Sequence, residues 1–164
     1  MVTAAHCTDT ASPGDVFVTV GNTILGTKFE SKSFIIDVEA VINHPDYNDQ
    51  TTENDISILR LAEKVDLYKY PHIKPACLPS YPYSGPGVVS GWGTVSSGGL
   101  MQSHLRDVEV DIYPQGDCGD YPPGDITPDM ICAGYPEGGS VSSIKIHGRC
   151  IFMEDHHGEC MTNS

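Results

Sequence analysis

The sequence predicts an all-β protein built from short strands. Apolar side chains either alternate with polar ones or gather in short β-branched runs, which is the pattern of half-buried strands. With 17 glycines and 12 prolines among 164 residues, the chain is also rich in turn-forming residues. No segment carries an amphipathic helical stripe of useful length. A Greek-key barrel or a sandwich is therefore the expected architecture.

Four strands are expected along the chain, and each has its own apolar pattern. The runs at 16–20 and 34–42 are rich in valine, isoleucine and phenylalanine, which favour strands. The third, 55–61, opens with a carboxylate and continues as an apolar strand. In the fourth, 107–112, valine and isoleucine alternate with acidic residues, which indicates one buried and one acidic face.

Turn signals separate the expected strands. Each contains proline, glycine or both, and most also contain serine or aspartate, residues that favour chain reversal for different steric reasons. The turn segments are 12–14, 44–46, 84–87, 97–99 and 121–124. No internal repeat with a fixed period accompanies them.

The charge of the chain argues against two classes of function. Asp and Glu number 22 against 9 Lys and Arg, which leaves a net charge of -13 at pH 7. A nucleic-acid-binding surface is basic, so nucleic acid is not expected as a partner. The same charge would be repelled by an anionic membrane surface, and no apolar run is long enough to span a bilayer.

The chain has six widely spaced cysteines and no CxxC pair. They are Cys7, Cys77, Cys118, Cys132, Cys150 and Cys160. This density favours disulfides and an oxidising, extracellular compartment. The first residues, MVTAAH, lack the basic start and apolar stretch of a signal peptide. We therefore expect the natural protein to begin upstream of Met1.

Two short segments carry the candidate chemistry. In TAAHC, small residues flank His6 and leave room for a second group beside the imidazole. In ENDISIL, Asp55 opens an apolar strand. Each residue alone has a plain structural explanation, the histidine as a satisfied core or surface residue and the aspartate as a turn or strand cap. Together, the carboxylate would hold one imidazole tautomer and make His6 a general base.

The sequence resembles the trypsin-like serine proteases of the chymotrypsin fold, the reference case for Ser-His-Asp catalysis. Five segments carry the resemblance in the family's order, namely TAAHC (3–7), NDISIL (54–59), KPACLP (74–79), VSGWGT (89–94) and MICAG (130–134). The resemblance covers residues 1 to about 139 and implies a double Greek-key β-barrel.

The resemblance also implies a function. It describes a secreted serine endopeptidase whose partners are protein or peptide substrates and protease inhibitors. It makes His6 the general base and Asp55 the residue that orients its ring. It implies no cofactor.

The sequence departs from the family pattern after Gly139. The Gly-Asp-Ser-Gly-Gly-Pro run that would carry the nucleophilic serine is absent. Ser140, Ser142 and Ser143 lie near its expected place without the glycines that would shape an oxyanion hole. The pocket aspartate that would indicate a preference for Lys or Arg is absent as well. The expectation is a polypeptide inactive as a peptidase; the alternative is a non-catalytic homologue that acts by binding proteins.

The resemblance divides the chain into three parts. Residues 1–80 would form part of an N-terminal barrel with the interdomain connection, 81–139 part of a C-terminal barrel, and 140–164 a divergent tail. The first strands of barrel one and the last strands of barrel two are expected to be missing. The chain is thus interpreted as truncated at both ends and as a pseudoenzyme. Alternative splicing, intron read-through or a frameshift would explain the divergent sequence of the tail.

The resemblance implies a disulfide between Cys118 and Cys132. It leaves Cys7 and Cys77 without the cysteines that they meet in the family, so both are expected as orphaned thiols. Calcium is not expected, because residues 20–23 offer no carboxylate and Glu30 alone is a weak ligand.

Three alternatives remain open for the tail. It could be unstructured, it could hold a Cys150–Cys160 disulfide, or it could bind zinc through the His/Cys pairs at 147–150 and 156–160. The separation of five residues between Cys150 and His156 is short for a buried zinc site, so no metal ligand is assigned.

Overall fold

The computed structural model describes residues 1–26, 32–78, 83–93, 100–114, 116–119, 121–122, 124–134 and 153–154. The strands are β1 (Val2–Thr3), β2 (Phe17–Val20), β3 (Phe34–Asn43), β4 (Ser57–Leu61), β5 (Gly85–Gly91), β6 (Arg106–Tyr113), β7 (Cys132–Gly134) and β8 (Met153–Glu154). Two three-residue 3-10 helices, η1 (Ala5–Cys7) and η2 (Pro13–Asp15), are the only helices among these residues. The predicted all-β class is confirmed. No helix in the described ranges is long and apolar enough to cross a membrane.

The chain forms two compact units. Among the described residues, the first unit contains 1–75 and 91–106, and the second contains 76–90 and the residues from 107 onward. The segment 91–106 belongs to the first unit because it pairs with the loop after β2. The Leu25 N–H donates to the Ser103 carbonyl at 2.7 Å, and the Leu105 N–H donates to the Thr23 carbonyl at 2.8 Å.

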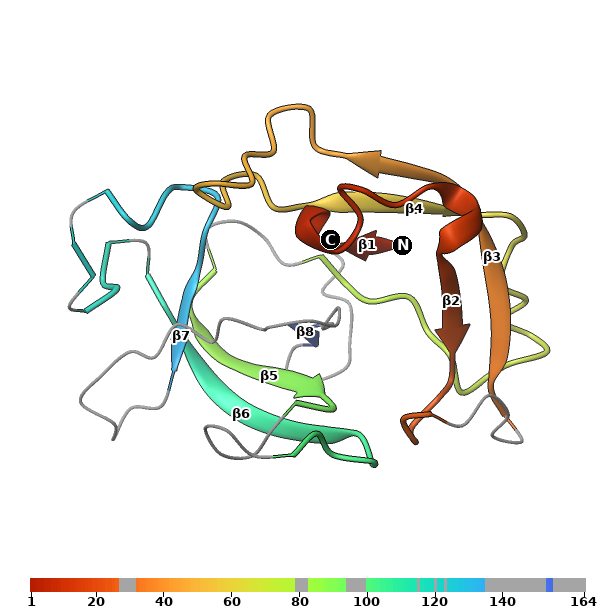
Figure 1. The fold of residues 1–164 in the computed structure, drawn as a ribbon. Coiled ribbons are helices and arrows are strands. Elements are labelled where there is room, and N and C mark those ends of the chain that lie inside the picture. Colours follow the sequence, from red (N-terminus) through yellow and green to blue (C-terminus); the bar gives the residue numbers. More distant parts are fainter. Residues whose placement is uncertain are drawn as a thin grey trace, which may run out of the picture. The chain divides into compact units, whose positions relative to one another are not determined.

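The first unit is built on an antiparallel sheet with the strand order β1-β4-β3-β2. In Figure 1, β2 and β3 run side by side, and β1 lies beside β4. One face of the sheet buries Val18, Val38 and Leu59, one residue from each of the three longer strands. The strands expected at 16–20, 34–42 and 55–61 place these side chains together, because every second residue of a strand faces the same side.

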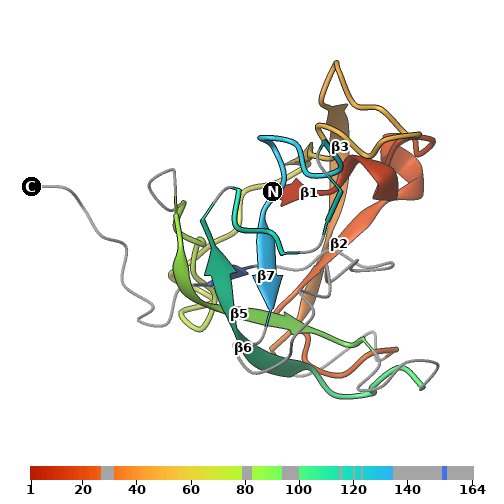
Figure 2. The same ribbon diagram turned by 90° about the vertical axis from the view of Figure 1, so that its left-hand side faces the viewer.

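The second unit contains a sheet with the order β7-β6-β5-β8. Figure 2 shows β5, β6 and β7 together on one curved surface. Its core joins Val89 of β5, Val110 and Ile112 of β6, and Ala133 of β7. In β6 the predicted alternation is confirmed at Val110 and Ile112, which are buried, whereas Val108 is 37 % exposed.

Strand β5 begins inside a segment that the sequence predicts as a turn. The prediction for 84–87 is wrong from Gly85 onward. Gly87 serves close packing instead of chain reversal, because a Cβ at this position would lie 2.9 Å from the Ile112 Cδ1 atom. Pro86 is accommodated with its carbonyl accepting a hydrogen bond from the Tyr83 hydroxyl at 2.8 Å.

Both sheets are curled, and within the described ranges each has two edge strands instead of closing on itself. A mostly β structure with curled, partly formed barrels is what the sequence predicts for an incomplete trypsin-like fold. The expected fold class is therefore confirmed.

Candidate functional site

Strand register brings His6 and Asp55 together although 49 positions separate them. Thr3, the last residue of β1, pairs with Ser57, the first residue of β4. The chain that leaves β1 turns directly into η1, which carries His6, while Asp55 lies two residues before β4. Because β1 and β4 are antiparallel, both side chains lie at the same end of the strand pair.

The Asp55 carboxylate binds His6 with both oxygens. Its Oδ2 lies 2.6 Å from the imidazole Nδ1, and its Oδ1 accepts the His6 backbone N–H at 2.8 Å. A carboxylate can only accept, so Nδ1 carries the ring proton. In the neutral ring, Nε2 then keeps its lone pair and can act as a proton acceptor.

The pair is accessible to solvent. The side chain of His6 is 42 % exposed and that of Asp55 is 25 % exposed. A solvated ion pair of this kind contributes little to stability, typically about 0–1 kcal/mol. Its main consequence is to fix the orientation of the ring.

A second set of hydrogen bonds attaches η1 to the end of β3. The buried Thr8 donates from Oγ1 to Asn43 Oδ1 at 2.8 Å, and Asn43 Nδ2 donates to the Thr8 carbonyl at 3.4 Å. Ala5, directly before the histidine, is fully buried beneath the turn. The small residues that flank His6 thus allow close packing of the turn that presents its ring.

The residue before Asp55 has an unusual backbone conformation. Asn54 has φ of 54°, in the left-handed region that asparagine enters more readily than most residues. Its Nδ2 donates to the Asp46 carbonyl at 3.0 Å, and its own carbonyl accepts the Ile56 N–H at 2.7 Å. This role of Asn54 was not predicted from the sequence. The signal that could have indicated it is the presence of an asparagine directly before Asp55.

Tyr47 is a further residue of the site that was not predicted from the sequence. It comes directly after the predicted turn at 44–46, where its N–H donates to the His44 carbonyl at 3.1 Å. Partial burial of the ring raises the pKa of Tyr47, and the nearby negative charges, of which Asp55 is the strongest, raise it further. The other contributors are Asp9, Asp49 and Cys7. The phenol is therefore a neutral neighbour of the His6–Asp55 pair.

We expect Tyr47 to ionise above the ordinary tyrosine pKa of about 10. Because its folded-state pKa is raised, its contribution to stability is complete below that ordinary value and is lost as the pH rises through the folded-state pKa. Substitution of Asp55 by asparagine removes one negative charge and should lower the Tyr47 pKa.

Resonances of the Tyr47 ring followed by NMR between about pH 8 and pH 12 would measure this ionisation. Asp66→Asn, which changes a carboxylate that makes no contribution at Tyr47, is the control and should leave the titration unchanged. A Tyr47 titration unaffected by Asp55→Asn would contradict the proximity described above.

The structure joins two of the predicted cysteines. Cys118 and Cys132 form a disulfide with an S–S distance of 2.02 Å. Cys77, expected as an orphaned thiol, is itself disulfide-bonded, so that prediction is wrong, and its partner lies outside the described residues.

The remaining candidates lie outside the described residues. These are Ser140, Ser142, Ser143, Cys150, Cys160 and the histidines at 147, 156 and 157. Within the part of the chain that is described, no group of three or more His, Cys, Asp or Glu side chains is arranged to hold a metal ion.

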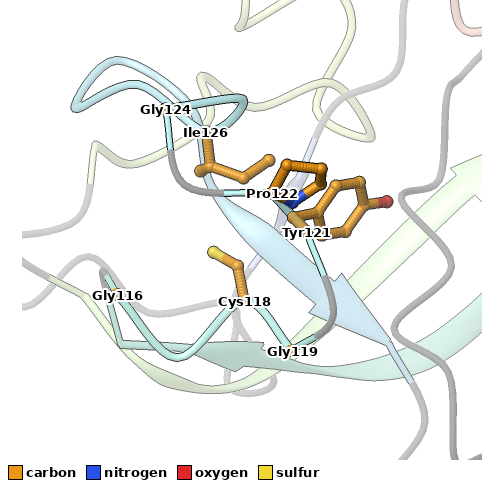
Figure 3. Close-up of a pocket in the computed structure, with 7 residues that line it drawn as sticks. All are labelled: Gly116, Cys118, Gly119, Tyr121, Pro122, Gly124 and Ile126. Carbon is orange, nitrogen blue, oxygen red and sulfur yellow. The ribbon is translucent and has the colours of Figure 1, made fainter.

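The second unit contains a cavity of about 270 Å³ beside the Cys118–Cys132 disulfide. Figure 3 shows Tyr121, Pro122, Ile126 and Cys118 around it, with three glycines on the surrounding chain. The lining is Gly116, Cys118, Gly119, Tyr121, Pro122, Gly124 and Ile126. Among these lining residues the Tyr121 phenol is the one ionisable side chain, so the described lining offers no catalytic group comparable to His6.

Comparison with known proteins adds a family relationship to this geometry. The family model described as Trypsin matches residues 1–144. Trypsin-1 from Astacus astacus is 32 % identical over 147 residues, covering 86 % of this chain and 61 % of the relative. Trypsin-2 from Salmo salar is 34 % identical over 144 residues, with 87 % and 59 % covered.

A bacterial relative gives the same result. Trypsin from Saccharopolyspora erythraea is 34 % identical over 143 residues, which cover 85 % of this chain and 60 % of the relative. The chain thus spans about three fifths of the length of the curated relatives that it matches.

Proposed function

The chain belongs to the trypsin family of serine proteases, and we propose that its His6 and Asp55 are the general base and the orienting residue of a serine endopeptidase. The contact of 2.6 Å between His6 Nδ1 and Asp55 Oδ2 is the observation that carries the proposal. It assigns the proton to one ring nitrogen and leaves the other as the acceptor.

In the proposed reaction, His6 Nε2 takes the proton of a hydroxyl group while the hydroxyl oxygen attacks a peptide carbonyl. The resulting imidazolium donates from Nδ1 to Asp55, whose negative charge stabilises it. The imidazolium then returns the proton from Nε2 to the leaving amine, which is general acid catalysis by the same ring. The solvent exposure of the His6 side chain is compatible with the approach of a substrate.

We propose that this 164-residue polypeptide does not complete that reaction. Its sequence contains no Gly-Asp-Ser-Gly-Gly run, and none of Ser140, Ser142 and Ser143 is followed by a glycine. In serine proteases the glycine-rich turn also supplies the backbone N–H groups that bind the developing oxyanion, and this sequence lacks that motif. In this proposal the polypeptide is a pseudoenzyme that retains the general base and its orienting carboxylate but not the nucleophile.

The proposed substrates and partners are those of the family. They are proteins or peptides, and the protein inhibitors that bind such proteases. The proposed location is extracellular, which the Cys118–Cys132 disulfide supports because disulfides persist in oxidising compartments.

The position of the proton on the His6 ring tests the proposed role. A base in this mechanism needs its neutral form protonated at Nδ1 and unprotonated at Nε2. Nitrogen NMR of the imidazole distinguishes the two tautomers, and we expect the Nδ1–H form. The opposite tautomer would rule out the assignment of His6 as an oriented base.

A further inference from the structure

Three polar residues lie side by side across the first sheet, at the end of β1 from which the chain enters η1. Thr3 of β1 pairs with Ser57 of β4, and Ser57 pairs with Asn43, the last residue of β3. Directly paired residues project from the same face of a sheet, so the three side chains form one polar row. Thr3 and Ser57 are buried and Asn43 is half-buried. Side chains in such positions need hydrogen-bond partners.

Asn43 finds its partner in the turn that presents His6. Its Oδ1 accepts the Thr8 hydroxyl at 2.8 Å, and its Nδ2 donates to the Thr8 carbonyl at 3.4 Å. Thr8 is buried and directly follows η1, which its own N–H closes by donating to the Ala5 carbonyl at 2.8 Å. One amide side chain thus uses both its acceptor and its donor to hold the residue that ends the turn.

The turn is therefore attached at two points. The His6 backbone N–H donates to Asp55 two residues before β4, and Thr8 is bound to Asn43 at the end of β3. The pairing of Asn43 with Ser57 fixes these two attachment points relative to each other, because it joins the ends of β3 and β4. A turn held at one point can pivot about that point, whereas a turn held at two points cannot.

We propose that Thr8 and Asn43 are positioning residues, which hold η1 so that His6 Nδ1 stays directed at Asp55 Oδ2. This inference rests on the proposed function of His6 as a base. The two residues act through the backbone of the turn, and their contact is better shielded from water than the exposed His6–Asp55 pair. Hydrogen bonds are stronger where water is excluded, so the shielded contact can hold the exposed one in place.

The residue types match this role. Asparagine carries an acceptor and a donor on one planar group, and Thr8 offers it a hydroxyl donor and a carbonyl acceptor. Valine at position 8 would keep nearly the shape of threonine but lose the hydroxyl. Alanine at position 43 would remove both hydrogen bonds and leave the Thr8 hydroxyl without its shorter contact.

The lifetime of the proton on His6 Nδ1 tests this inference. In the full 164-residue chain, NMR at a pH at which the ring is neutral measures how fast this proton exchanges with water. We expect Thr8→Val to speed the exchange on the order of tenfold, because losing a buried hydrogen bond allows η1 to move. Thr8→Ser keeps the hydroxyl and should stay near the wild-type rate. Asn43→Ala should speed the exchange at least as much as Thr8→Val.

Ser57→Ala is the matched control. Ser57 is buried, and its Oγ donates to the Ile42 carbonyl at 3.3 Å, so this variant loses a hydrogen bond within the sheet. The lost bond does not attach η1. Ser57→Ala should therefore lower the free energy of unfolding and leave the exchange of the Nδ1 proton unchanged.

Equal exchange rates in wild type and folded Thr8→Val would overturn the inference. The same acceleration in Ser57→Ala would also overturn it, because the effect would then follow from any lost hydrogen bond in this region. If Thr8→Val fails to fold, Asn43→Ala decides in the same way. These results leave the proposed function intact where the wild-type ring is protonated at Nδ1, whereas a wild-type ring protonated at Nε2 would overturn both.

Discussion

The 164-residue polypeptide is expected to release no product from peptide esters or amides beyond spontaneous hydrolysis. His6 and Asp55 can accept and stabilise a proton, but the sequence has no serine in a glycine-rich nucleophile turn. In serine proteases, loss of the nucleophile lowers kcat by about 10⁶-fold. Loss of one oxyanion-hole donor costs a further factor of about 10²–10³ where the nucleophile is present.

A fluorophosphonate reagent makes this expectation quantitative. It should leave every serine of the polypeptide unlabelled under conditions that label a complete trypsin to one equivalent. The His6→Gln variant is the control, because any ester hydrolysis that persists unchanged in it does not use the proposed base. Stoichiometric labelling of Ser140, Ser142 or Ser143 would show that the polypeptide carries an activated nucleophile.

Substitution of Leu59 by alanine is expected to lower the free energy of unfolding by about 2–5 kcal/mol. Leu59 is 4 % exposed and packs with Val18 and Val38 in the core of the first unit. Removing its side chain both loses buried apolar surface and leaves a cavity. Urea denaturation followed by circular dichroism would measure the difference.

Ile58→Ala is the matched control for Leu59→Ala. Ile58 precedes Leu59 in β4 but faces the opposite side of the sheet and is 50 % exposed. Its truncation should cost about 1 kcal/mol or less, because half-exposed side chains lose little buried surface. Equal losses for the two variants would contradict the direction in which β4 faces its core.

The sequence predicted the longer strands, in which apolar side chains mark the face that is buried. The runs at 16–20, 34–42 and 107–112 match β2, β3 and β6 to within one residue at each end, because one face of each strand is buried and the other is not. The two residues of β1 are too few for any periodicity to show. In β5, glycine and proline suggested a turn, whereas the tertiary contact of Gly87 with Ile112 determines the role of that glycine.

The residues of the candidate site were predictable where a short sequence motif contains the reactive side chain. TAAHC and NDISIL identified His6 and Asp55, and the structure brings these two side chains into contact. The groups around them depend on the folded chain and were not predictable in this way. Tyr47 and Asn43 reach the site from the turn after β3 and from its last residue, and neither carries a signal in the sequence that distinguishes it from an ordinary polar residue.

Nitrogen NMR of the His6 imidazole, in wild type and in Asp55→Asn, is the decisive test of the role proposed for this pair. In wild type, we predict that the neutral ring carries its proton on Nδ1, because a carboxylate can only accept. In Asp55→Asn, the side-chain oxygen can still accept the His6 backbone N–H, which directs the amide NH₂ group at Nδ1 and moves the ring proton to Nε2. A wild-type ring protonated at Nε2, or the same tautomer in both proteins, would contradict the claim that Asp55 orients His6 as a base.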